Sequence, residues 1–302
     1  MVEHLNRLNR VPALVALALL LLAGCGRDEV VFQQRSEYQQ VLVTEGREGV
    51  RTLRFGSRRG AVQSRVVVGD PLDLRVPYVR AAMAGLAFLE PPLDDFGTRS
   101  LSVLVVGLGG GSIPMYLHQV LPAAQIDVAE LDPLVVQVAD EWFGLREDER
   151  LRIRVGDGRE WIEQAAARAA PRYDLIVLDA YGEREVPPAL TTLEFLRAVR
   201  GVLAPGGVVV ANLWGGRSNP LYPSMLRTYG EVFGQVHELA VPARSNRIVV
   251  ALDSPTAAPR ELERRAAHLA RTLPGRLGLE ELFRGDSRVD PEDLRGEVLR
   301  DG

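Results

Sequence analysis

The chain contains no lysine and only one cysteine, and each scarcity excludes a class of chemistry. All 36 of its Lys and Arg residues are arginines, so no lysine can follow the glycines of a phosphate-binding NTPase loop. A single cysteine excludes an intramolecular disulfide. No pair among the four histidines has the spacing of metal ligands, so the sequence predicts no metal site. The net charge of -4 is mixed rather than basic, and nucleic acid is therefore not an expected partner.

An apolar run near the N-terminus is too short to span a bilayer. Residues 11–24, VPALVALALLLLAG, would rise about 21 Å as a helix, against a hydrocarbon core of about 30 Å. Two arginines precede the run and small residues end it. This pattern predicts a signal peptide over residues 1–24.

The end of that run, Leu22-Ala23-Gly24-Cys25, resembles the lipobox of bacterial lipoproteins. In that family the cysteine is lipidated and becomes the mature N-terminus, so the resemblance implies lipidation at Cys25. We expect a lipoprotein anchored on the periplasmic or extracytoplasmic side of a membrane. The alternatives are an uncleaved anchor, or a misassigned start codon in a cytoplasmic protein.

The rest of the chain divides into three parts by pattern. Residues 30–75 contain short alternating runs separated by glycines, which predicts a small antiparallel β unit. Residues 76–255 alternate apolar strands with amphipathic helices, which is typical of an α/β fold whose parallel sheet is covered on both faces. We expect about seven strands there, including a final antiparallel pair. Residues 256–302 are expected to form a peripheral helix and tail.

A glycine loop, GLGGGS, follows the first strand of the α/β part and contains Gly107, Gly109 and Gly111. Ligands of open parallel sheets bind beyond the carboxyl ends of the strands, where glycine lets the backbone approach them closely. Pro114 falls in the first turn of the following helix, where its missing N–H group is tolerated.

Acidic residues stand at the carboxyl ends of the next strands. Glu130 has the spacing of a carboxylate that accepts hydrogen bonds from ribose hydroxyls, and it would repel a 2′-phosphate. Asp157 is placed to reach an adenine amino group, and Asp179 ends a further strand, whereas Asp132 reads as a helix cap. These acids suit adenosine with a cationic sulfonium tail better than a dinucleotide. Trp214, also at a strand end, belongs either to the core or to the pocket.

With these motifs the sequence resembles the spermidine synthases, which are polyamine aminopropyltransferases. The resemblance spans roughly residues 34–253 and rests on the segments SEYQQVLV, AVQS, VPYVR, GLGGGS, AELD, GDGREW and YDLIVLDAY. It implies a Rossmann-like domain of the class I methyltransferase type with a small N-terminal β domain. It also implies aminopropyl transfer from decarboxylated S-adenosylmethionine, a co-substrate rather than a permanent cofactor, to a putrescine-type amine.

The resemblance assigns roles to individual residues. Asp179 would be the catalytic carboxylate, and Tyr78 and Gln63 would line the amine side. The residues expected to hold the nucleoside are Gln39, Gly107, Gly109, Gly111, Glu130, Asp157 and Gly158. The family forms dimers and tetramers through its β region, so a homodimer is also expected.

Three positions depart from the family pattern. Gly110 and Gly182 replace acids that would contact the donor tail and the acceptor amine, and Arg80 replaces an acid beside Tyr78. We expect Arg80 to repel a polyamine, and Glu183 or Glu185 could substitute for a lost acid. Two alternatives to aminopropyl transfer therefore stay open: an S-adenosylmethionine-dependent methyltransferase on the same scaffold, and a non-catalytic lipoprotein that binds a nucleoside or polyamine.

Overall fold

The computed structural model describes residues 28–90, 97–168, 173–182, 186–216, 219–284 and 287–302. The expected signal peptide and Cys25 lie outside the described residues. No described helix is both long enough and apolar enough to cross a membrane.

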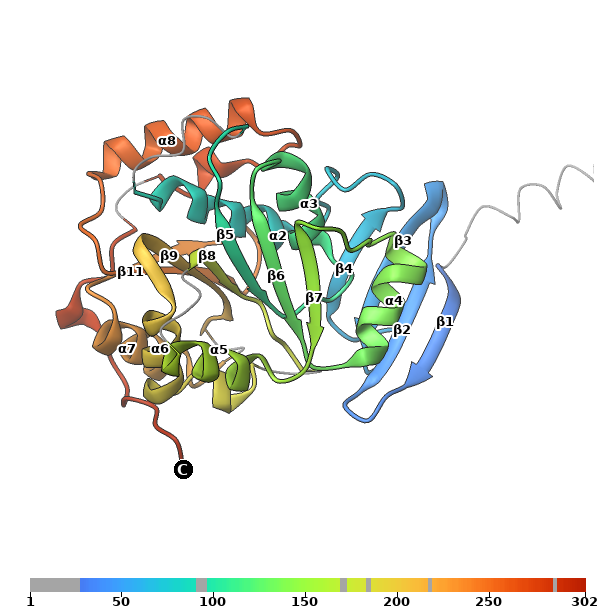
Figure 1. The fold of residues 1–302 in the computed structure, drawn as a ribbon, viewed down its shortest axis with the longest axis horizontal. Coiled ribbons are helices and arrows are strands. Elements are labelled where there is room, and N and C mark those ends of the chain that lie inside the picture. Colours follow the sequence, from blue (N-terminus) through green and yellow to red (C-terminus); the bar gives the residue numbers. More distant parts are fainter. Residues whose placement is uncertain (1–27, 91–96, 169–172, 183–185, 217–218, 285–286) are drawn as a thin grey trace, which may run out of the picture.

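A small antiparallel sheet opens the described chain, as the alternating pattern predicted. Its strands lie in sequence order, and they are β1 (Glu29–Arg35), β2 (Gln40–Glu45), β3 (Val50–Phe55) and β4 (Val62–Val67). In Figure 1 this sheet forms one end of the molecule.

A seven-stranded mixed sheet forms the larger part and confirms the predicted α/β fold with its final antiparallel pair. Its strands are β5 (Ser102–Val106), β6 (Gln125–Glu130), β7 (Leu151–Val155), β8 (Tyr173–Leu178), β9 (Leu203–Trp214), β10 (Gln235–Ala240) and β11 (Asn246–Leu252). The spatial order is β10-β11-β9-β8-β5-β6-β7. Strands β5 to β9 pair in parallel, whereas β11 runs antiparallel between β9 and β10.

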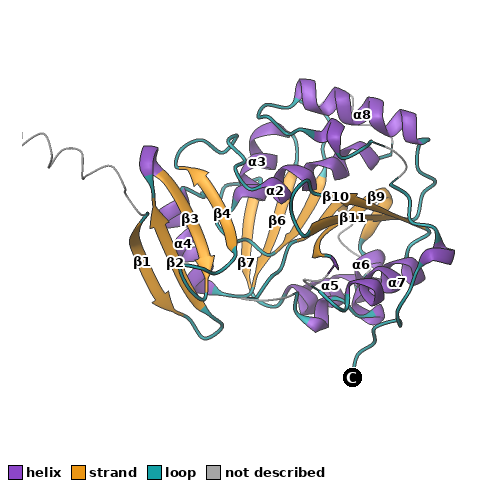
Figure 2. Cartoon of the chain, turned by 180° about the vertical axis from the view of Figure 1, so that it is seen from behind, coloured by secondary structure: helices purple, strands orange, loops and turns teal. Residues whose placement is uncertain are grey.

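Helices cover both faces of the large sheet. They are α2 (Pro77–Ala82), α3 (Ser112–Val120), α4 (Pro133–Phe143), α5 (Gly158–Ala167), α6 (Leu193–Gly201), α7 (Tyr222–Val232) and α8 (Pro259–Thr272). Figures 1 and 2 show α5, α6 and α7 together on one face and α2, α3 and α8 on the other. Helix α2 leaves α geometry at Met83, and the chain continues as a 3-10 helix to Phe88.

Strand β5 shows why both faces are buried. Val103 and Val105 belong to one apolar cluster, whereas Leu104 and Val106 belong to the cluster on the opposite face. Successive strand residues point to opposite faces, so a continuous apolar run buries itself on both sides of the sheet.

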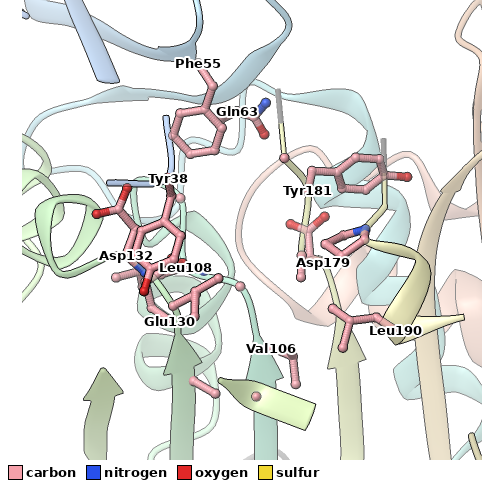
Figure 3. A pocket seen from close by; sticks show the side chains of 18 of the residues that line it. Tyr38, Phe55, Gln63, Val106, Leu108, Glu130, Asp132, Asp179, Tyr181 and Leu190 are labelled. Atoms are coloured by element: carbon pink, nitrogen blue, oxygen red, sulfur yellow. Dashed lines mark hydrogen bonds between the residues drawn. The ribbon is translucent and has the colours of Figure 1, made fainter. Parts of the chain in front are cut away.

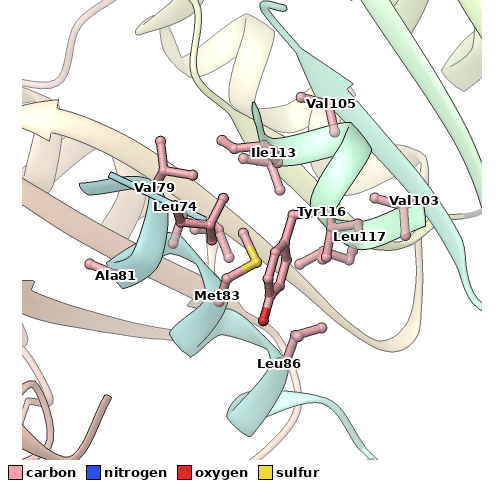
Figure 4. Packing of buried hydrophobic residues seen from close by; sticks show 14 of the residues in the cluster. Leu74, Val79, Ala81, Met83, Leu86, Val103, Val105, Ile113, Tyr116 and Leu117 are labelled. Atoms are coloured by element: carbon pink, nitrogen blue, oxygen red, sulfur yellow. The ribbon is translucent and has the colours of Figure 1, made fainter. Parts of the chain in front are cut away.

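The first cluster is tightly packed where α2 and α3 meet β5. Figure 4 shows Tyr116 from α3 lying against Met83 and Leu86 of the 3-10 segment. All three side chains are fully buried, and the Tyr116 hydroxyl donates to the Pro274 carbonyl at 2.6 Å. Burial of these three side chains contributes about 2 kcal/mol each, which holds the 3-10 segment against α3.

The residues after β11 contribute to the core, although they were expected to be peripheral. Leu279 and Phe283 are buried in the first cluster. Near the C-terminus, the Leu299 N–H donates to Thr228 on α7, and Asp301 pairs with Arg159 on α5. The C-terminal segment therefore packs onto both helical layers.

The small sheet docks beside the carboxyl ends of the parallel strands. Strand β4 contacts α3, and β2 contacts α4. The Ser36 hydroxyl donates to Asp132 Oδ2 at 2.6 Å, and the Arg51 guanidinium donates to the Trp142 carbonyl at 2.6 Å. The two sheets thereby enclose the end at which the predicted site residues lie.

Candidate active site

A cavity of about 300 Å³ lies between the small sheet and the carboxyl ends of β5, β6 and β8. In Figure 3 Phe55 and Gln63 approach it from the small sheet, with Glu130 and Asp132 on one side and Asp179 and Tyr181 on the other. The predicted site residues that line it are Gln39, Gln63, Tyr78, Gly107, Gly109, Glu130, Asp157, Gly158 and Asp179. Gly111 is not among its lining residues; it caps the start of α3 with φ 78°.

The glycine loop turns beside the residues that follow β8. Gly107 has φ 95°, and a Cβ atom there would lie 2.5 Å from the Asp179 carbonyl oxygen. Its N–H donates to the Ala129 carbonyl at 2.8 Å. Only glycine combines this backbone angle with this approach, so Gly107 sets the position of Asp179 beside the cavity.

Gly110, where the family has an acid, leaves no room for any side chain. A Cβ atom would lie 2.8 Å from Ser64 Cβ and 2.9 Å from Phe143 Cδ1. The Gly110 N–H donates to Ser64 Oγ at 2.8 Å. The small sheet therefore occupies the space of the absent carboxylate, and neither Gly110 nor Phe143 lines the cavity.

Glu130 ends β6 and is almost completely buried. Its two oxygens accept from the Leu108 N–H at 2.8 Å and the Asp132 N–H at 2.9 Å. Burial raises its pKa above the ordinary value, and these two hydrogen bonds oppose the rise. Each oxygen keeps a second lone pair, so the carboxylate is fixed in place and can still accept from the hydroxyls of a ribose.

Asp132 and Asp157 are both helix caps at the edge of the cavity. Asp132 accepts from the Leu134 N–H at 2.9 Å, which confirms the predicted cap of α4. Asp157 accepts from the Arg159 N–H at 2.8 Å and caps α5. Asp157 is exposed, so its remaining acceptor capacity is available to a ligand in the cavity.

Asp179 follows β8 and faces two hydrogen-bond donors. Its Oδ1 accepts from Asn212 Nδ2 at 2.9 Å, and its Oδ2 accepts from the Tyr78 hydroxyl at 3.2 Å. Burial raises the pKa of Asp179 to about 7, although both hydrogen bonds act to lower it. Asp179 is partly exposed and lines the cavity. Near neutral pH the carboxyl group can therefore exchange a proton with a bound amine.

A polar network that the sequence analysis missed supports Asp179. Asn212 Oδ1 accepts from Asn246 Nδ2 at 2.9 Å, and the Tyr181 hydroxyl donates to the Asn212 carbonyl at 2.8 Å. Asn212 is a polar residue inside the apolar run of β9, and this interruption of the run could have identified it as a candidate site residue. Its partner Asn246 lies on β11 and could not be assigned without the strand order.

Arg80 does not face the cavity, so the expectation that it would repel a polyamine there is wrong. Its guanidinium donates to the Leu74 carbonyl at 2.6 Å, on the side of α2 away from Tyr78 and Val79. Gly182 lines the cavity as expected, and the candidate substitutes Glu183 and Glu185 lie outside the described residues.

A second cavity of about 320 Å³ adjoins the first. Gln63, Tyr78 and Tyr181 line both, so they form a shared wall. Trp214 lines only the second cavity, and its ring lies 5.2 Å from that of Tyr181. Trp214 is thus a pocket residue, one of its two predicted roles.

Known proteins resemble this chain along most of its length. The spermine/spermidine synthase domain matches residues 92–233. A polyamine aminopropyltransferase of Vibrio vulnificus is 32% identical over 271 residues, which cover 88% of this chain and 87% of the relative. The chain belongs to the spermine/spermidine synthase family. It is therefore an enzyme of the aminopropyltransferase type.

Methyltransferases are also related to this chain. The human eEF1A lysine and N-terminal methyltransferase is 35% identical over 68% of the chain, which corresponds to 31% of that longer protein. The structure of human Methyltransferase-like protein 13 in complex with SAH has a TM-score of 0.62 at 34% identity, covering 65% of this chain and 92% of that one.

Solved spermidine synthase structures share the fold. A probable spermidine synthase from Corynebacterium glutamicum has a TM-score of 0.67 at 23% identity, over 90% of this chain and 96% of that one. At that identity the likeness supports the two-sheet architecture alone.

Proposed function

We propose that this protein transfers an aminopropyl group from decarboxylated S-adenosylmethionine to an amine. One observation carries the proposal: the first cavity is lined by four carboxyl groups and, among the described residues, by no basic side chain. A donor that carries a sulfonium and an ammonium group suits such a cavity, whereas an anionic nucleotide would be repelled.

The geometry assigns the donor's parts to opposite sides of the cavity. Glu130 and Asp157 would hold the ribose and adenine, as the family resemblance implies. The reacting carbon would then lie toward Asp179, across the cavity. Tyr78 and Gln63 stand in the shared wall, where the acceptor amine would enter.

Asp179 would act on the acceptor amine. The amine must be neutral to attack, and a carboxylate with a pKa of about 7 can take its proton. The nitrogen lone pair forms the new N–C bond while the C–S bond breaks. The sulfonium electrons return to sulfur, methylthioadenosine leaves, and the amine proton passes to Asp179 and then to water.

The test is to incubate the purified protein with decarboxylated S-adenosylmethionine and a set of amines, and to follow methylthioadenosine by mass spectrometry. We expect amine-dependent release of methylthioadenosine together with an amine product heavier by one aminopropyl group. Donor binding without any product would instead support the non-catalytic binding protein.

A second candidate is methyl transfer from S-adenosylmethionine. It is favoured by Gly110, because the glycine loop there has no acid to repel the carboxylate of the methionine moiety. The same assay with S-adenosylmethionine distinguishes the two, since methyl transfer releases S-adenosylhomocysteine and aminopropyl transfer releases methylthioadenosine.

We also propose, from the sequence alone, that the mature chain begins at a lipidated Cys25 and is anchored to a membrane. The test is membrane fractionation of cells with and without globomycin, which inhibits cleavage of lipoprotein signals. Accumulation of the uncleaved precursor supports the anchor, and a soluble cytoplasmic protein contradicts it. The predicted homodimer is tested by light scattering on the purified protein.

A further inference from the structure

The second cavity has a charge opposite to that of the first. Arg65, Arg75 and Arg244 line it, and no aspartate or glutamate does so in the part of the chain that the structure describes. These arginines come from β4, from the segment before α2 and from the turn between β10 and β11. Three separate parts of the fold therefore direct positive charge to one cavity.

Among the residues that the structure describes, two of these three guanidinium groups have no carboxylate partner. Arg75 Nε pairs with Asp73 Oδ2 at 2.6 Å. Arg65 and Arg244 have no carboxylate within ion-pair distance among the described residues, and both are exposed to solvent. They remain available to an anionic group that enters the cavity.

The second cavity lies directly behind the groups that would activate the acceptor. Its lining includes Tyr78, whose hydroxyl is 3.2 Å from Asp179 Oδ2, and Asn212, whose amide is 2.9 Å from Asp179 Oδ1. An amine held at Asp179 would therefore extend past the shared wall into the second cavity. Trp214 lines the second cavity and would contact the apolar middle section of such an amine.

We infer that the preferred acceptor is an amine that also carries an anionic group, a carboxylate or a phosphate, which Arg65 and Arg244 bind. This inference rests on the proposed aminopropyl transfer and specifies its acceptor. A diamine would place its second ammonium group among guanidinium groups, which is electrostatically unfavourable. An anionic amine meets complementary charge, and Arg can bind carboxylate and phosphate through two parallel N–H donors.

The arginines also assist the reaction itself. Nearby positive charge lowers the pKa of a bound ammonium group and increases the fraction of neutral amine. The atoms balance as in the proposed transfer, because the anionic group takes no part in bond formation. Its role is to orient the nucleophile toward the donor carbon.

The test uses three acceptors with four carbon atoms each and a different group at the far end: 1,4-diaminobutane, 4-aminobutyrate and 4-aminobutylphosphonate. With decarboxylated S-adenosylmethionine, we expect kcat/KM for one of the anionic amines to exceed that for the diamine by tenfold or more. The comparison of carboxylate with phosphonate decides which anion the site takes.

Charge reversal identifies the residues responsible. Arg65→Glu and Arg244→Glu should each raise KM for the anionic amine at least tenfold. Each should also raise kcat/KM for the diamine. Arg152→Glu, at an exposed position on β7 outside both cavities, is the matched control and should change neither acceptor.

The possible failures are distinguishable. Methylthioadenosine release with the diamine alone, unaffected by both reversals, overturns the inference and leaves the proposed function intact. If no amine supports release, the proposed function fails. The inference is then judged by calorimetric binding of 4-aminobutyrate in the presence of methylthioadenosine, and binding that is absent or insensitive to both reversals overturns it.

Discussion

Burial and hydrogen bonding shift the pKa of the Asp179 carboxyl group in opposite directions. Burial disfavours its charged form, while Asn212 and Tyr78 each donate a hydrogen bond that favours it. The balance raises its pKa to about 7, where a carboxylate is a stronger base than in water and is still largely ionised in slightly alkaline solution. Its chemical behaviour therefore depends on its neighbours as much as on its own side chain.

The pH dependence of turnover follows from this value. The base must be ionised, so kcat/KM should rise with pH through about 7 and be lost below it. Asp179→Asn should lower kcat by about 10²–10⁴-fold at every pH while methylthioadenosine binding persists. The measurements are a pH–rate profile of the wild type and calorimetric binding of the variant. A profile without a limb between pH 6 and 8 would contradict the role of Asp179.

The two hydrogen-bond donors to Asp179 should affect its pKa to different extents. Removing either raises the pKa of Asp179, and the Asn212 bond lowers that pKa more than the Tyr78 bond does. We expect Asn212→Ala to move the acidic limb upward by about one pH unit, and Tyr78→Phe by less. Tyr116→Phe, whose hydroxyl bonds the distant Pro274 carbonyl, is the control. An unmoved limb in the Asn212 variant would show that its amide does not stabilise the carboxylate.

At the scale of elements, the glycine loop and β4 form one structural unit. Ser64 on β4 satisfies the Gly110 N–H and lies where a side chain at Gly110 would have to go. The missing family acid is thus a packing requirement of the docked small sheet rather than a simple loss.

Restoring that acid should fail for a steric reason. Gly110→Asp places its Cβ within 3 Å of Ser64 and Phe143, so we expect a loss of stability of about 1–3 kcal/mol and weaker donor binding. Gly234→Ala, whose added Cβ has its nearest contact at 3.4 Å, is the control. Thermal denaturation and methylthioadenosine titration measure both effects. A Gly110→Asp protein with unchanged stability and faster turnover would show that the loop can open to admit the acid.

The sequence predicted elements better than it predicted the contacts between them. Glu130, Asp157 and Asp179 could be identified because parallel strands present their carboxyl ends at one edge. Asn246 could not, because its place beside Asn212 depends on β11 entering antiparallel between β9 and β10. Arg80 was misjudged because the two-residue step from Tyr78 along α2 turns its side chain to the opposite side of the helix. The pairing of strands that are distant in the sequence and the direction of individual side chains are the properties hardest to predict from a single sequence.

At the scale of the whole molecule, the first cavity is completed only when the two sheets are docked. Gln39, Phe55 and Gln63 come from the small sheet and its flanking loops, while Glu130 and Asp179 come from the large sheet. A ligand in this cavity therefore contacts both sheets at once. Donor binding and docking of the small sheet are expected to stabilise each other.

The coupling between donor binding and docking of the small sheet should be measurable by thermal denaturation. Methylthioadenosine at about one hundred times its Kd should stabilise the fold by about 2.7 kcal/mol. Each 1 kcal/mol shifts the Tm of a protein of this size class by about 2–4 °C, so the Tm should rise by about 5–11 °C. Phe55→Ala, in the small sheet, should reduce the rise at a fixed ligand concentration because it removes part of the cavity wall. An equal rise in both proteins would mean that the nucleoside contacts the large sheet alone.

The three arginines of the second cavity and the acids of the first cavity lie in different parts of the sequence. Gly107, Glu130, Asp157 and Asp179 all lie within residues 92–233, the family domain, whereas Arg65, Arg75 and Arg244 lie outside it. The acids of the reaction centre and the arginines proposed to select the acceptor are thus encoded in separate stretches of the gene. Exchanging Arg65 and the β10–β11 turn between relatives, with Gln63 and Ser64 of β4 retained, should retarget the enzyme without rebuilding its reaction centre.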